Sequence, residues 1–150
     1  LDMNKILIIN GPNLNLLGNR ENNFYGNTTL DKIKSICDEH CKLNKLESVF
    51  YQSNHEGELI EKIHSADKDF DGIIINPAAF THTSIAILDA LRAISKPKVE
   101  IHISNIYARE DYRRKSLTSE AVNGVICGFG ENGYVLAIDA MKKLIYNEKT

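Results

Sequence analysis

The sequence predicts an α/β fold with a five-stranded parallel sheet and helices on both faces. Two runs of consecutive apolar residues, at 6–9 and 73–75, are bounded by turn formers. Such runs are typical of strands that are buried on both faces of a sheet. Strand-like and helix-like segments alternate along the 150 residues, which indicates right-handed βα crossovers. For five strands of this kind, the flavodoxin-like order 2-1-3-4-5 is expected.

Two predicted helices separate the first three strands. Residues 10–12, Asn-Gly-Pro, end the first strand because proline cannot extend a β-ladder. Thr28 or Thr29 can cap a helix, and apolar residues then recur at helical spacing to about Leu43. The expected elements are a strand at 6–9, a helix at about 28–43, a strand at 46–51, a helix after a turn at 52–57, and a strand at 73–75.

The second half of the chain continues the alternation. Thr81 or Thr83 is expected to begin a helix with His82 and Asp89 on one face, because residues seven apart lie two helical turns apart. The remaining expected elements are a strand at 99–103, a long polar segment at 104–119, a strand at 122–127, a turn at 128–133 and a final helix.

The composition limits the possible classes of protein. The formal net charge of −2 gives no overall attraction to nucleic acid or to an anionic membrane. No apolar run reaches the roughly 20 residues of a membrane span, and no secretory leader is expected. Cys37, Cys41 and Cys127 lack a CxxC spacing, so free thiols in a reducing cytoplasm are expected. Residues 1–2 precede the first methionine and are interpreted as an expression or processing remnant, which leaves 3–150 as one domain.

Polar residues follow the predicted strands at 10–13, 76–82, 102–105 and 128–133. In open α/β sheets, ligands bind beyond the carboxyl ends of the strands. Asn13 is therefore a site candidate, although an asparagine in this position can also serve only the turn.

Glu100 and His102 are expected on one face of a strand because the side-chain period of a strand is two. A carboxylate beside an imidazole fixes its tautomer and favours its protonated form, which suits a general acid. A purely structural pair is the alternative. A metal site needs several converging ligands, and His82 with His102 is too small a set, so no metal is expected.

An asparagine-rich loop at 17–27, with a glycine near each end, has the composition of a mobile lid. It contains Arg20 and Tyr25. Nearby guanidinium groups favour the phenolate form of a tyrosine, and a phenolate can remove a proton next to a carbonyl. Other cations are expected at the same edge, where they form either a solvated face or a carboxylate site; they are Arg109, Arg113 and Arg114.

The segment 128–133 matches GxGxxG between a strand and a helix. It belongs to the last βα unit, so no further strand supplies the acid that binds a ribose. Glu131 also places a negative charge where a pyrophosphate would lie. A structural turn is therefore expected at 128–133. For the protein as a whole, the alternative function is a non-catalytic flavodoxin-like module that binds a nucleotide or another anion.

Several motifs, in order along the chain, resemble the type II 3-dehydroquinate dehydratase family. They are NGPNLNLLG at 10–18, RE at 20–21, YG at 25–26, QSNHEG at 52–57, NPAAFTHTS at 76–84, EIHISN at 100–105, ARE at 108–110 and RR at 113–114. The resemblance implies anti dehydration of 3-dehydroquinate to 3-dehydroshikimate through an enolate. It places this reaction in the shikimate pathway of aromatic amino acid biosynthesis, without cofactor or metal.

The resemblance also implies roles for individual residues. Tyr25 is the base, Arg20 keeps it reactive, and Asn13 holds a water against the enolate oxygen. His102 protonates the departing hydroxyl and is oriented by Glu100. The implied substrate-binding residues are Asn76, His82, Asp89, Ile103, Ser104 and Arg113, with Arg109 supporting the lid. Asp89 is implied to act across a subunit boundary in a homododecamer of four trimers.

Overall fold

The computed structural model describes residues 3–18 and 27–149, and its centre is a five-stranded sheet in the order β2-β1-β3-β4-β5. All neighbouring strands are parallel, so the predicted fold and strand order are confirmed. The strands are β1 (Asn4–Asn10), β2 (Leu46–Gln52), β3 (Gly72–Asn76), β4 (Lys98–His102) and β5 (Gly124–Cys127).

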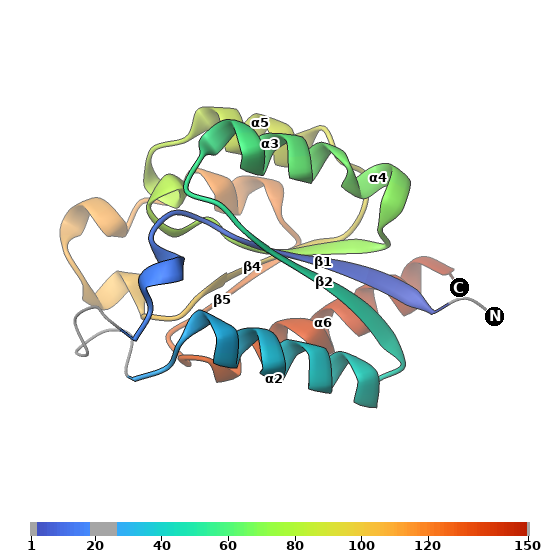
Figure 1. Ribbon diagram of the computed structural model, residues 1–150. Helices are drawn as coiled ribbons and strands as arrows, with labels where there is room; N and C mark the ends of the chain where they lie inside the picture. The colour runs from blue at the N-terminus through green and yellow to red at the C-terminus, as the bar shows by residue number, and fades with distance from the viewer. Residues whose placement is uncertain (1–2, 19–26, 150) are drawn as a thin grey trace.

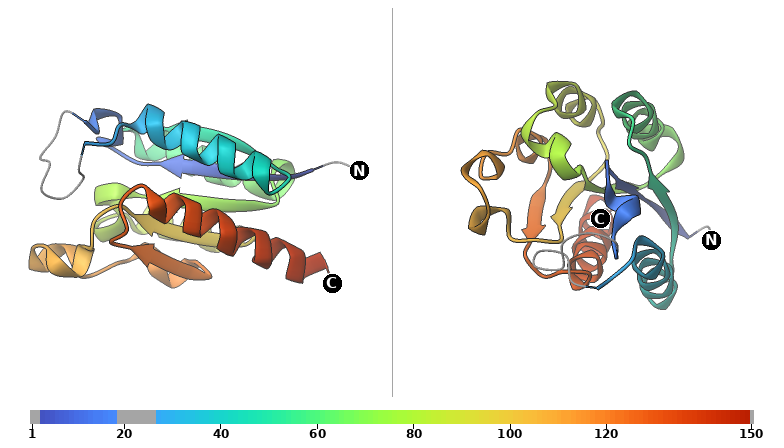
Figure 2. Two further views of the ribbon diagram at one scale, coloured as in Figure 1. Left: turned by 90° about the horizontal axis from the view of Figure 1, so that it is seen from below. Right: turned by 60° about the vertical axis from the view of Figure 1, so that its left-hand side comes forward.

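Helices cover both faces of the sheet (Figure 1). One face carries α2 (Leu30–Leu43) and α6 (Asn132–Lys149), which lie side by side (Figure 2). The other face carries α3 (Glu56–His64), α4 (Ala66–Asp69) and α5 (Ile85–Arg92). In the described part of the chain, no helix combines the length and the apolar character that crossing a membrane requires.

The central strands are buried on both faces, as their apolar runs predict. Ile6 and Ile8 pack toward α2 and α6, whereas Leu7 and Ile9 pack toward α3 and α5. All four side chains are fully buried. Alternation of side chains along a strand therefore divides the core into two apolar layers, one on each side of the sheet.

The helix after β3 begins later than the sequence analysis expects. The side chain of Ser84 accepts a hydrogen bond from the backbone N–H of Ile87, so Ser84 is the N-cap and α5 starts at Ile85. His82 belongs instead to a 3₁₀ helix, η2 (Ala78–His82). The expectation that His82 and Asp89 share one helix face is therefore wrong.

The polar segments contain further short turns. Thr29 caps α2, as expected, by accepting a hydrogen bond from the backbone N–H of Lys32. The helix α3 begins at Glu56, inside the segment predicted as a turn. Additional 3₁₀ helices are η1 (Leu14–Leu16), η3 (Ile106–Ala108), η4 (Asp111–Arg113) and η5 (Thr118–Ala121).

Candidate active site

The carboxyl ends of β1, β3 and β4 meet at one edge of the sheet. Asn10 is the register partner of Asn76, and Ile75 is the partner of Glu100. Beyond these ends lies a cavity of about 100 Å³. Its lining residues are Pro12, Asn13, Leu14, Asn76, Ala78, Ala79, His82, His102, Ile103, Ser104, Ile106, Arg109 and Arg113.

Most of the candidate residues named in the sequence analysis line this cavity, although they come from four separate segments. Glu100 lies behind the cavity lining, where it contacts His102. Asp89 is exposed on α5 and is not among the lining residues. Arg20 and Tyr25 lie outside the described residues.

His102 and Glu100 form a buried pair at the end of β4. Nε2 of His102 lies 2.7 Å from Oε2 of Glu100, and Glu100 is fully buried. Because an ionised carboxylate only accepts hydrogen bonds, Nε2 carries the proton in this contact. Nδ1 is then the ring nitrogen that can exchange a proton with a molecule in the cavity.

The second oxygen of Glu100 is also bonded. The hydroxyl of Thr118 donates to Oε1 of Glu100 over 2.5 Å, and Thr118 is fully buried. A buried carboxylate needs partners for both oxygens to offset the loss of hydration. The contacts with His102 and Thr118 supply them.

His82 is held by a different contact. Its Nδ1 lies 2.7 Å from the carbonyl oxygen of Lys115. A carbonyl cannot donate, so Nδ1 carries the proton and Nε2 of the neutral ring can accept one. Burial lowers the pKa of His82, with Arg113 and His102 acting in the same direction. The neutral form that accepts a hydrogen bond from a hydroxyl is therefore favoured.

Asn76 and Asn10 are joined by the hydroxyl of Tyr134, which lies at the start of α6 and is fully buried. This hydroxyl donates to Oδ1 of Asn10 over 2.6 Å and accepts from Nδ2 of Asn76 over 3.1 Å. Oδ1 of Asn76 accepts from the backbone N–H of Ala78. The amide of Asn76 is consequently fixed in one orientation at the edge of the cavity.

Asn13 follows β1 in a left-handed backbone conformation, with φ of 69°, which asparagine tolerates better than most residues. Its backbone N–H donates to Oδ1 of Asn54 over 2.9 Å. Gln52 donates both to this oxygen and to the carbonyl of Gly11. The end of β2 therefore holds Asn13 against the cavity.

Two arginines line the cavity on the side of the 3₁₀ helices. Nε of Arg113 lies 2.8 Å and Nε of Arg109 3.8 Å from Oε2 of Glu110. Nη1 of Arg109 also donates to Ser104 over 3.4 Å. The forked donors of a guanidinium group suit a carboxylate ligand, and two such groups line this side of the cavity. Arg114 instead pairs with Asp111 and is more than half exposed.

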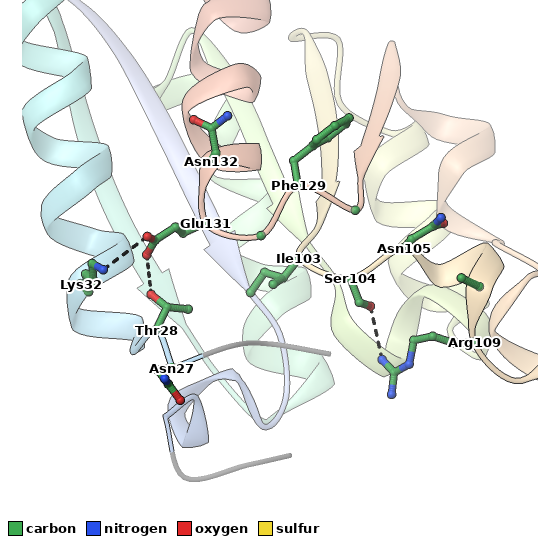
Figure 3. Close-up of a pocket in the computed structure, with 13 residues that line it drawn as sticks. Asn27, Thr28, Lys32, Ile103, Ser104, Asn105, Arg109, Phe129, Glu131 and Asn132 are labelled. Atoms are coloured by element: carbon green, nitrogen blue, oxygen red, sulfur yellow. Dashed lines mark hydrogen bonds and ion pairs between the residues drawn. The ribbon is translucent and has the colours of Figure 1, made fainter. Parts of the chain in front are cut away.

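A larger hollow of about 830 Å³ adjoins this cavity and shares Ile103, Ser104 and Arg109 with it (Figure 3). Its far side holds Glu131, which accepts from Thr28 over 2.6 Å and pairs with Lys32. The hydrogen bond from Thr28 is the main cause that lowers the pKa of Glu131. A carboxylate held in its charged form within the GxGxxG segment opposes phosphate binding there.

Gly128 and Gly130 adopt positive φ values of 97° and 61°. Their backbone N–H groups donate to the carbonyls of His102 and Ile103. These glycines therefore close the turn against the end of β4, where other residues would be strained. Within the described ranges, no group of three or more His, Cys, Asp or Glu side chains could hold a metal ion.

The sequence analysis missed Thr118, Lys115 and Tyr134. Thr118 is 18 positions from Glu100, Lys115 is 33 positions from His82, and Tyr134 is 58 positions from Asn76. Lys115 takes part through its backbone carbonyl, which no residue type reveals. Of these three residues, only Tyr134 could have been identified from the sequence. A tyrosine in the first turn of a core helix needs a hydrogen-bond partner for its hydroxyl.

The fold and the site together define a flavodoxin-like α/β protein with a carboxylate–imidazole pair at the carboxyl edge of its sheet. Comparison with known families specifies the class further. The model of the family described as Dehydroquinase class II matches residues 4–142. The chain belongs to this family, as the sequence motifs predict.

Individual relatives agree with this assignment. A 3-dehydroquinate dehydratase of Clostridium botulinum (strain Okra / Type B1) is 54% identical over 147 residues, which cover 98% of this chain and 100% of the relative. One from Thermotoga neapolitana is 51% identical over 140 residues, covering 93% and 95%. The crystal structure of type II dehydroquinase from Butyrivibrio crossotus DSM 2876 superposes with a TM-score of 0.91 at 50% identity, covering 93% of this chain and 97% of that chain. The alternative of a non-catalytic binding module is not favoured.

Proposed function

We propose that this chain removes water from 3-dehydroquinate to give 3-dehydroshikimate, a step of the shikimate pathway. The buried Glu100–His102 pair carries the proposal, because it presents an acid to a cavity lined by Asn76, His82 and Arg113. Membership of the dehydroquinase class II family, and the chain's similarity to the two 3-dehydroquinate dehydratases described above, indicate the substrate.

The acid half of the reaction uses His102. A C–H bond next to the ketone breaks first and leaves an enolate. The C–O bond to the departing hydroxyl then breaks as the C=C bond forms, and a proton from Nδ1 of His102 converts the hydroxyl into water. Glu100 stabilises the charged imidazole and keeps the other nitrogen engaged, which fits their 2.7 Å contact.

The base half uses Tyr25, with Arg20 keeping the phenol reactive, and Arg109 stabilises the closed site. The motif resemblance supports these roles of Tyr25 and Arg20, and the place of Arg109 in the lining supports its part. Asn13 holds a water that stabilises the enolate oxygen. Its position in the lining and its bond to Asn54 support this role.

The substrate hydroxyls and carboxylate bind to polar groups on the remaining walls. Asn76 and the neutral ring of His82 bind hydroxyls, and Arg113 is a cation for the carboxylate. Backbone N–H groups of Ile103 and Ser104 complete the carboxylate site. All of these residues line the same cavity, and no cofactor takes part in the proposed reaction.

Asp89 completes the site of a neighbouring subunit. Its exposure on α5, away from the cavity of its own chain, supports this role. Residues 3–150 then form one catalytic domain, and the domains assemble into a cytoplasmic homododecamer of four trimers. Sedimentation velocity tests the assembly: a stable monomer with full activity contradicts the role of Asp89.

The reaction is tested by following the ultraviolet absorbance of the conjugated enone product. Purified protein is mixed with 3-dehydroquinate in the presence of a chelator, and a continuous rise in absorbance is expected. Tyr25→Phe should lower turnover by at least about 10²-fold, the lower range for a general base. Tyr112→Phe, at an exposed tyrosine of η4, is the matched control. A wild-type protein that forms no enone overturns the proposed function, and a fully active Tyr25→Phe removes Tyr25 from it.

A further inference from the structure

The carboxylate of Glu100 is held at both ends by buried groups. His102 contacts Oε2 over 2.7 Å, and the hydroxyl of Thr118 donates to Oε1 over 2.5 Å. Thr118 is fully buried and is not among the cavity-lining residues. The Thr118 hydroxyl therefore acts on the cavity through its contact with Glu100.

The segment that carries Thr118 is itself fixed. The backbone N–H of Leu117 donates to the carbonyl of Thr81 over 2.9 Å, and the carbonyl of Lys115 accepts from His82. The 3₁₀ helix η5, which begins at Thr118, also packs against α5. The Thr118 hydroxyl thus has a set position relative to both histidines.

We propose that Thr118 is a positioning residue, whose hydroxyl fixes the plane of the Glu100 carboxylate and thereby the orientation of the His102 imidazole. A carboxylate bonded at one oxygen can rotate about its last side-chain bond. A second bond at the other oxygen removes this freedom. The Nδ1 atom of His102 is then directed toward the leaving hydroxyl before the substrate binds. This inference rests on the proposed function.

Thr118→Val tests the inference because it replaces the hydroxyl with a methyl group of similar size. Loss of one charge-assisted hydrogen bond is expected to lower kcat by about tenfold or more. KM should stay within about twofold, because Thr118 does not touch the cavity. Thr118→Ser, which keeps the hydroxyl, should restore most of kcat. In ¹⁵N NMR spectra, the ring nitrogens of His102 should shift in the valine variant and keep wild-type values in the serine variant.

Ser48→Ala is the matched control. The hydroxyl of Ser48 also donates to a carboxylate, Oδ1 of Asp38, but this bond joins β2 to α2 and neither residue lines the cavity. The same loss of a hydroxyl there should leave kcat and the His102 signals unchanged. If Thr118→Val does not fold, Thr118→Cys replaces it, since a thiol is a weak donor.

The outcomes separate this inference from the proposed function. If the wild type converts 3-dehydroquinate and Thr118→Val keeps both its kcat and its His102 signals, the role of Thr118 is overturned. The same holds if only the melting temperature changes. If the wild type forms no enone, the proposed function fails, and the NMR comparison alone then decides whether Thr118 orients His102.

Discussion

Glu100 and His102 occupy alternate positions at the end of β4, so their side chains meet on one face of the strand, with 2.7 Å between Oε2 and Nε2. Both residues are buried. The strand backbone therefore sets the spacing of the pair, and no flexible loop lies between the two groups.

Glu100→Gln tests the need for a charge at this position. The amide oxygen of glutamine can accept the same bond from His102, but it carries no charge to stabilise the imidazolium. We expect kcat to fall on the order of 10²-fold, within the range that a general acid contributes. Steady-state kinetics measure the change. Glu47→Gln, at an exposed position of β2, should have wild-type kinetics.

Tyr134→Phe removes the hydroxyl that joins Asn10 and Asn76. Two buried amide groups then lose a partner, so the free energy of unfolding should fall by about 1–3 kcal/mol. KM should rise because the amide of Asn76 is no longer fixed. Urea denaturation and initial rates measure the two effects. Tyr146→Phe is the control, since Tyr146 is 70% exposed on the same helix; equal stability of the two variants contradicts the prediction.

The lowered pKa of His82 predicts a pH dependence of stability. Burial disfavours the charged ring in the folded state, whereas the ring in the unfolded chain titrates near its ordinary value of about 6.5. Between the folded and unfolded pKa values the unfolded chain binds more protons, so stability falls as the pH falls through this window. Below the folded-state pKa, the whole contribution of His82 to the free energy of unfolding has been lost.

Urea unfolding at about pH 7.5 and about pH 5.5, on either side of the ordinary histidine value, measures this contribution. His82→Asn does not titrate, and its amide can still donate to Lys115. The variant should lose less stability on acidification than the wild type. His55→Asn, at an exposed residue before α3, should behave like the wild type. If the stability of His82→Asn falls between the two pH values as much as that of the wild type, the prediction is wrong.

The backbone of Ala78 is in a strained conformation. It adopts a left-handed conformation with φ of 53°, which costs a residue with a Cβ about 1–2 kcal/mol. Ala78→Gly relieves this strain, although it also removes a methyl group. Ala79 has no positive φ, and glycine there costs up to about 1 kcal/mol. Thermal unfolding should show Ala78→Gly to be more stable than Ala79→Gly by about 1 kcal/mol; the reverse order refutes the prediction.

The sequence was sufficient to predict the sheet because its signal is local. Two runs of isoleucine and leucine, at 6–9 and 73–75, contribute side chains to both layers of the core, as expected of central strands. The start of α5 was harder to predict. Three hydroxyl residues lie at 81–84, each of which can cap a helix, and only the tertiary fold selects Ser84.

The residues of the site also fall into those that local sequence patterns predict and those that depend on the tertiary fold. Residues that lie at strand ends, such as His102 and Asn76, follow from the strand prediction. Thr118 and Tyr134 reach the site across the fold, and their contacts depend on packing that no local pattern contains. The motif resemblance could identify residues at the cavity surface, but it gave no indication of these supporting groups.

The Asn10–Asn76 pairing has a consequence for how the protein loses activity on warming. These residues are adjacent members of the central β-ladder, and the N–H of Gly11 extends that ladder to the carbonyl of Asn76 over 2.8 Å. Backbone hydrogen bonds within central strands belong to the part of a fold that opens least readily. If activity is lost on warming before the sheet melts, we therefore expect the connecting segments to open first, and cooling should restore activity.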